Sequence, residues 1–176
     1  MSRFVACACL FFLMFALQTS FITSLPPPFR FMPILFAFGM YALQYVRGPF
    51  GPWWLVLQGA FLDLSRMGVM PGEIVVYLTV SLIGIFLTRR LFSHRTLSGT
   101  VGCSLVCLAF LHALHTVFFF GQAWITGVPV PWSDLGLFFL VQAVFLTLWA
   151  SLLFFFFQKT AVVLRRLFVF FPHQTS

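Results

Sequence analysis

Most of this chain consists of long apolar stretches that are separated by short segments containing proline, glycine or charged residues. Of its 176 residues, 61% are hydrophobic and only 7% are charged, and just three are acidic. A soluble domain carries about 25% charged residues, so this chain could not cover a water-facing surface. We therefore expect lipid to be the solvent for most of the chain, in one membrane domain.

The apolar stretches predict about six membrane-spanning helices, because one crossing needs about 20 mainly apolar residues. The expected bounds are Phe4–Leu25, Phe31–Val46, Phe50–Leu64, Glu73–Thr88, Leu97–Phe120 and Leu135–Gln158. The predicted fold is an all-α integral membrane protein whose residues 1–158 form a six-helix transmembrane domain. The first stretch also resembles a signal peptide, but its long run without a charge favours a retained helix.

Residues 159–176 are expected to form a basic cytoplasmic tail. Its apolar part, Ala161–Phe171, is interrupted by Arg165 and Arg166 and is too short to cross a bilayer. This pattern favours a helix that lies at the membrane surface with its arginines among the headgroups.

The distribution of basic residues predicts that both chain ends face the cytoplasm, since cytoplasmic loops carry an excess of Lys and Arg. In this arrangement Arg30 and Arg66 face outward, together with all three acidic residues. The basic residues expected inside are Arg3, Arg47, Arg89, Arg90, Arg95, Lys159, Arg165 and Arg166. We expect Arg89, Arg90 and Arg95 to set the topology and to meet a cytoplasmic partner or anionic membrane lipid.

The net charge of +7 does not indicate binding to nucleic acid, because the basic residues are scattered among apolar stretches and form no basic stripe. The cysteines, Cys7, Cys9, Cys103 and Cys107, all lie within apolar stretches and lack zinc-ligand spacing. We expect each of them to be buried as a small apolar side chain.

A polar break between the third and fourth predicted helices is the most informative segment. An acid near the end of an apolar helix, such as Asp63, is costly and needs a partner or an aqueous cavity. Arg66 follows three residues later on the same helix face and could pair with it. The other residues of the break are Gly68, Pro71, Gly72 and Glu73. Two interpretations stay open: a notch facing a partner or ligand, or an interfacial Asp–Arg pair that anchors a loop.

Signatures of catalysis are weak. His112 and His115 share one helix face and could bind a metal or haem, but the sequence offers no further ligands near them. Hydrogen bonding between helices is therefore the favoured interpretation of both. The sequence contains no P-loop, no G-x-S-x-G and no closely spaced carboxylate pair. We expect a protein that is not an enzyme and binds no cofactor.

The polar break and its flanking helices carry a family resemblance. The stretch Gly-Ala-Phe-Leu-Asp-Leu at residues 59–64, the glycine-containing break and the closing Arg-Arg-Leu-Phe at residues 89–92 resemble the bacterial rod-shape-determining protein MreD family. The Pro71-Gly72 step is similar to the family's usual entry into the fourth helix. The resemblance covers about Pro33–Arg95, while the phenylalanine content and the basic tail depart from the family pattern.

The resemblance implies a multi-pass scaffold in the bacterial inner membrane. Members of the family bind MreC and help couple the cytoskeleton to the peptidoglycan synthase pair, RodA with a class B penicillin-binding protein. The family fold is similar to the S components of energy-coupling-factor transporters. That similarity implies an alternative, a subunit that captures a vitamin or another small molecule.

Overall fold

A computed structural model describes residues 2–45, 50–65, 72–90, 96–127 and 132–168. Within these residues all regular structure is helical. The α-helices are α1 (Ser2–Ala16), α2 (Ile34–Tyr45), α3 (Phe50–Ser65), α4 (Glu73–Arg90), α5 (Leu97–Thr126) and α6 (Trp132–Phe168). Helix α1 continues into the π-helical turn η1 (Leu17–Phe21) and the 3-10 turn η2 (Ile22–Ser24), and η3 (Phe29–Phe31) precedes α2.

The all-α prediction is confirmed for the described residues, and each predicted stretch overlaps one α-helix. Helices α3 and α4 follow the predicted bounds closely, whereas α2 has only 12 residues because it begins after Pro33. Helix α5 continues to Thr126, past the predicted end at Phe120. Helix α6 runs without interruption through residue 158, so one helix joins the predicted transmembrane domain and the predicted tail.

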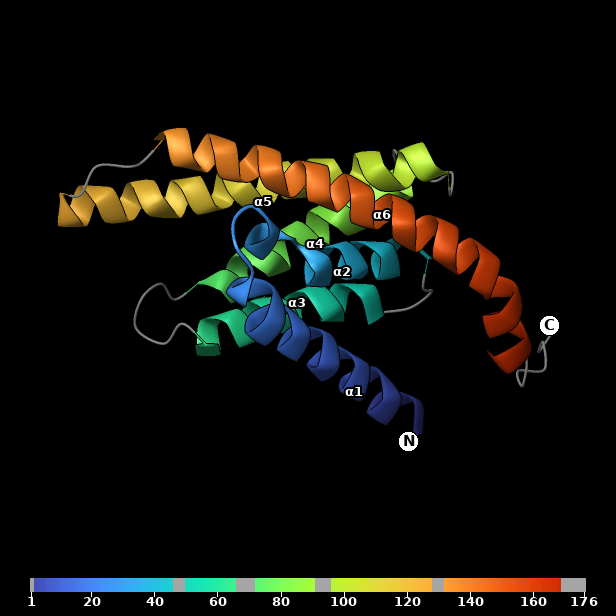
Figure 1. The fold of residues 1–176 in the computed structure, drawn as a ribbon. Helices are drawn as coiled ribbons and strands as arrows, with labels where there is room; N and C mark the ends of the chain where they lie inside the picture. Colours follow the sequence, from blue (N-terminus) through green and yellow to red (C-terminus); the bar gives the residue numbers. More distant parts are fainter. Residues whose placement is uncertain (1, 46–49, 66–71, 91–95, 128–131, 169–176) are drawn as a thin grey trace.

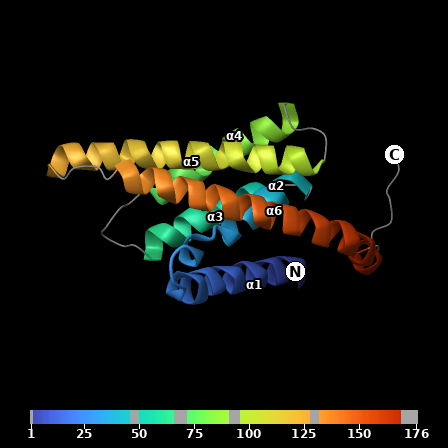
Figure 2. The same cartoon turned by 45° about the horizontal axis from the view of Figure 1, so that its top comes forward.

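Among the described residues, two helices are long and apolar enough to cross a membrane. Their apolar parts are Leu97–Gly121 in α5 and Leu135–Phe156 in α6. These two helices lie side by side as a long hairpin, and the shorter helices α2, α3 and α4 pack beneath it (Figures 1 and 2). The beginning of α1 and the end of α6 lie on the same side of the bundle (Figure 1).

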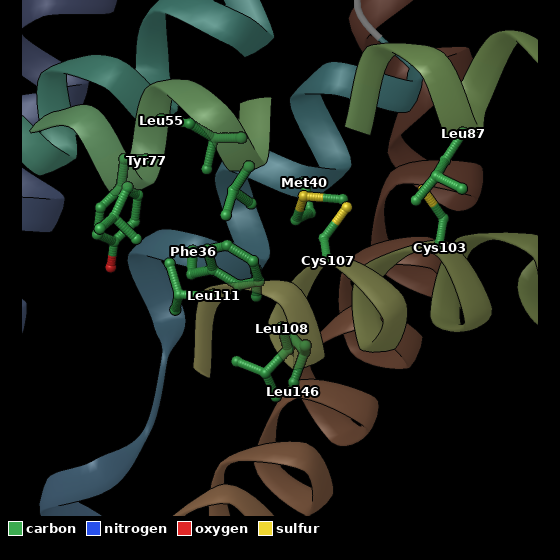
Figure 3. Close-up of a cluster of buried hydrophobic side chains, with 13 residues drawn as sticks. Phe36, Met40, Leu55, Tyr77, Leu87, Cys103, Cys107, Leu108, Leu111 and Leu146 are labelled. Carbon is green, nitrogen blue, oxygen red and sulfur yellow. The ribbon is translucent and has the colours of Figure 1, made fainter. Parts of the chain in front are cut away.

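The main core lies where five helices meet, and every helix except α1 contributes to it (Figure 3). Its fully buried side chains include Met40 from α2, Leu55 from α3, Val80 from α4, Cys107 from α5 and Leu146 from α6. Aliphatic and sulfur-containing side chains fill such a core without requiring hydrogen-bond partners.

Helix α1 packs separately through an aromatic cluster. Phe11 is buried against Trp54 of α3 with their ring centroids 5.0 Å apart, and Phe61 packs against the same ring of Phe11. Because α1 uses only one face for this contact, Cys9 is exposed, and the expectation that Cys9 is buried is wrong. Cys103 and Cys107 are buried as expected, and the side chain of Cys7 lies outside the described part of the structure.

Candidate functional site

The candidate site is a polar cluster where the adjoining ends of α3 and α4 meet the middle of α5. It is formed by Gln58, Asp63, Glu73, Tyr77 and His115. Its central interaction is a helix cap. The Asp63 Oδ1 atom accepts hydrogen bonds from the backbone N–H groups of Gly72 at 3.0 Å and Glu73 at 2.8 Å. Its Oδ2 atom accepts from the N–H group of Ile74 at 2.9 Å.

The cap explains why a carboxylate occurs at the end of an apolar helix. The first N–H groups of any α-helix lack partners within the helix, and an acceptor must be supplied from elsewhere. A residue next to the helix usually supplies it, but here the acceptor comes from the preceding helix. A negative charge at this position also interacts favourably with the positive end of the α4 dipole.

Gly59 allows α3 and α4 to approach closely enough for this cap. A Cβ atom on Gly59 would lie 2.8 Å from the carbonyl oxygen of Glu73 and 2.9 Å from the Cβ atom of Tyr77. Small residues permit such close approach of helix backbones in membrane proteins. Gly72, at the start of α4, has a φ of +128°, which a residue with a side chain rarely adopts.

Glu73 joins α4 to α5. Its side chain is buried, and the Oε2 atom lies 2.8 Å from the Nε2 atom of His115. A buried carboxylate requires hydrogen-bond partners of this kind because its desolvation is costly. The pair therefore holds the end of α4 against the middle of the long helix α5.

Gln58 and Tyr77 lie one helical turn deeper, between α3 and α4. The Gln58 Nε2 group donates a hydrogen bond to the Tyr77 hydroxyl at 3.2 Å. The Gln58 Oε1 atom is buried and accepts no hydrogen bond within the described part of the chain. An unsatisfied buried acceptor costs about 1–3 kcal/mol, so a hydrogen-bond donor that reached this oxygen would recover part of that free energy.

His112 joins α5 to α6. Its Nε2 atom lies 2.8 Å from the Oε1 atom of Gln142. The predicted hydrogen bonding between helices is thus confirmed for both histidines, although each bonds to a different helix. Within the described residues, no group of three His, Cys, Asp or Glu side chains lies close enough together to hold a metal ion.

The His112–Gln142 hydrogen bond is expected to make a modest contribution to stability. Hydrogen bonds between membrane helices contribute about 0.6 kcal/mol on average and at most about 1.7 kcal/mol. We expect a double-mutant cycle with His112→Ala and Gln142→Ala, measured by unfolding in mixed detergent micelles, to give a coupling free energy in this range. If the two substitutions changed the free energy of unfolding additively, the coupling free energy would be zero and the hydrogen bond would contribute nothing to stability.

The structure brings together only some of the predicted site residues. Asp63, Gly72 and Glu73 form the cap. Arg66, Gly68, Pro71 and Arg95 lie outside the described residues, so the predicted Asp63–Arg66 pair stays a prediction. Arg89 and Arg90 are exposed at the opposite end of α4.

Sequence reasoning missed several polar contacts between helices. Gln18, in the turn that follows α1, accepts a hydrogen bond from the backbone N–H group of Leu35 at 2.7 Å and so caps the first turn of α2. Tyr77 and Gln142 also form polar contacts that sequence reasoning did not identify. Each is an isolated polar residue in an apolar stretch, and that isolation is the signal that could have revealed them.

Comparisons with known proteins identify no relative. Neither protein-family models, nor curated proteins, nor solved structures gave a match to this chain.

Proposed function

We propose that the chain is a multi-pass protein of the bacterial inner membrane with six transmembrane helices and both ends in the cytoplasm. In this proposal it is a non-enzymatic scaffold of the MreD type in the cell-elongation machinery. It binds MreC and links the cytoskeleton to RodA and its class B penicillin-binding protein. Its fold is of the kind found in the S components of energy-coupling-factor transporters.

The Asp63 cap is the observation that supports this proposal most directly. The resemblance to the family rests on the segment from Gly59 to Glu73, and the described residues at the two ends of this segment have a defined physical task. Gly59 lets two helices touch, and the Asp63 carboxylate accepts all three hydrogen bonds at the start of α4. Two helix ends held together in this way suit a protein that presents a fixed surface to partners.

An affinity purification from bacterial membranes in mild detergent tests the proposal. We expect mass spectrometry of the co-purifying proteins to find MreC or the synthase pair. We also expect Asp63→Asn to reduce recovery of MreC more than it reduces membrane insertion. Ser65→Ala, at an exposed position one half-turn away, is the matched control and should leave recovery unchanged. Recovery of MreC at the wild-type level with Asp63→Asn would contradict a role of this residue in assembly.

One observation favours the alternative, a subunit that captures a small molecule. The unsatisfied Gln58 Oε1 atom, together with Tyr77, forms a buried polar position such as ligand pockets use to orient a bound molecule. In that case the same purification would recover a membrane coupling subunit with paired ATPases in place of MreC. That result would overturn the scaffold proposal.

A further inference from the structure

The exposed face of α4 carries a short apolar stripe with charged residues at both of its ends. The exposed large side chains on this face are Ile74, Val75, Leu78, Leu82 and Phe86. Asp63 and Glu73 lie at one end of the stripe, and exposed Arg89 and Arg90 lie at the other. The apolar residues from Ile74 to Thr88 rise about 22 Å along the helix. This length is well below the hydrocarbon thickness of a typical bilayer, about 30 Å.

The hairpin of α5 and α6 has a much longer apolar surface. Its apolar parts, Leu97–Gly121 and Leu135–Phe156, contain 25 and 22 residues. They rise about 37 Å and 33 Å along their helices. Both views show the hairpin extending beyond the ends of α3 and α4 (Figures 1 and 2).

The contact between Glu73 and His115 fixes the relative height of the short and long helices. Beyond His115, α5 continues to Thr126, which is a further rise of about 16 Å. The residues just above this contact, Val117, Phe118, Phe119 and Phe120, are all exposed and apolar. Four consecutive apolar residues point to all sides of a helix, so this part of α5 has no face suited to water.

A flat bilayer cannot match both faces. Tilting a helix shortens the distance that it spans along the membrane normal, so tilt cannot lengthen the α4 stripe. A short apolar stretch bounded by charges is accommodated by local thinning of the bilayer, by snorkelling of the flanking side chains or by oligomerisation, and of these only thinning brings the two headgroup layers closer together. The exposed Arg89 and Arg90 complement the anionic headgroups of the cytoplasmic leaflet and would hold that boundary in place.

We infer that the α4 face binds a locally thinned bilayer with an anionic inner leaflet, while the α5–α6 face meets bilayer of ordinary or greater thickness. The protein thus imposes a step in membrane thickness across its own width. This inference rests on the membrane location given under Proposed function, but not on the identity of any protein partner.

Spin-label depth measurements test the step. The full-length chain carries Cys7→Ala and Cys9→Ala, while Cys103 and Cys107 stay because they are buried. On α4, a single cysteine then replaces either Ile74 or Phe86. On α6, a single cysteine replaces either Leu137 or Phe156, and this pair is the matched control. All four native side chains are exposed. The labelled variants are reconstituted in vesicles of dioleoylphosphatidylcholine with a minor fraction of dioleoylphosphatidylglycerol. Power saturation with oxygen and a water-soluble nickel chelate gives the depth of each label below the nearer bilayer surface.

The bilayer thickness beside one helix equals the two label depths plus the distance between the labels along the membrane normal. A smaller sum of the two depths therefore means a thinner bilayer. The α4 positions are about 18 Å apart along the helix, and the α6 positions are about 28 Å apart. In a thinned bilayer we expect the two α4 depths to add up to about 4 Å, whereas a flat bilayer about 30 Å thick would give about 12 Å. A tilted protein in a flat bilayer would give a still larger sum. For the α6 pair we expect a sum below about 5 Å in either case.

The outcomes separate this inference from the proposed function. A sum near 12 Å on α4 would overturn the thickness step but leave the membrane location intact. Labels that are accessible to the nickel chelate at all four positions would overturn the membrane location itself. Neither result depends on MreC, which the affinity purification tests separately.

Discussion

Replacing Gly59 by alanine is expected to destabilise the protein by about 2 kcal/mol, within the usual cost of over-packing. The new Cβ atom would lie 2.8 Å from the backbone oxygen of Glu73, so α3 and α4 would have to move apart. The direction of the effect is diagnostic, because Gly→Ala in a helix interior normally stabilises by up to about 1 kcal/mol. Unfolding in mixed detergent micelles measures the change in the free energy of unfolding.

Gly121 in α5 provides the matched control for this prediction. Among the described residues, no atom outside the adjacent turns of α5 lies within 4 Å of the position that a Cβ atom on Gly121 would occupy. Gly121→Ala should therefore show the ordinary gain in helix stability. Equal effects of the two substitutions would mean that α3 and α4 are not in close contact at Gly59.

The second large effect is expected at Asp63. Asp63→Ala removes the acceptor of three backbone hydrogen bonds at the start of α4. Leaving buried N–H groups without partners costs about 1–3 kcal/mol for each group. Because two of these bonds are part-buried and one is exposed, we expect a total loss of about 3 kcal/mol.

Asp63→Asn should fall between the wild type and Asp63→Ala, because the amide retains one carbonyl oxygen and loses the negative charge. Thermal unfolding in detergent would show this order of stability, with Ser65→Ala as the control at an exposed neighbouring position. If Asp63→Ala were as stable as the wild type, the cap would contribute nothing to the fold.

Apolar length was enough to predict where the helices lie, but not where they end. The bounds of α3 and α4 could be predicted because charged and glycine-containing segments interrupt the apolar stretches there. The far end of α5 was not predicted, because the expected stretch ended at Phe120 whereas the backbone stays helical to Thr126. The true end is at Gly127, which adopts a left-handed conformation with a φ of +70°.

The candidate site was predicted only in part, for a physical reason. The sequence identified Asp63 as costly and in need of partners, but spacing within one helix pointed to Arg66. The partners that the structure describes are backbone N–H groups, which every residue except proline carries and which no sequence pattern marks. The contact between Glu73 and His115 joins residues 42 positions apart and depends on how α4 and α5 pack.

The two side-chain caps, Gln18 on α2 and Asp63 on α4, have a consequence for how the protein is made. Each acceptor precedes, in the order of synthesis, the helix whose N–H groups it satisfies. Each unpaired N–H group of a helix that enters lipid costs several kcal/mol of free energy. In the membrane proposed here, the acceptor is already inserted when the next helix leaves the ribosome. For α2 and α4, an earlier segment of the chain therefore supplies the acceptor that the entering helix requires.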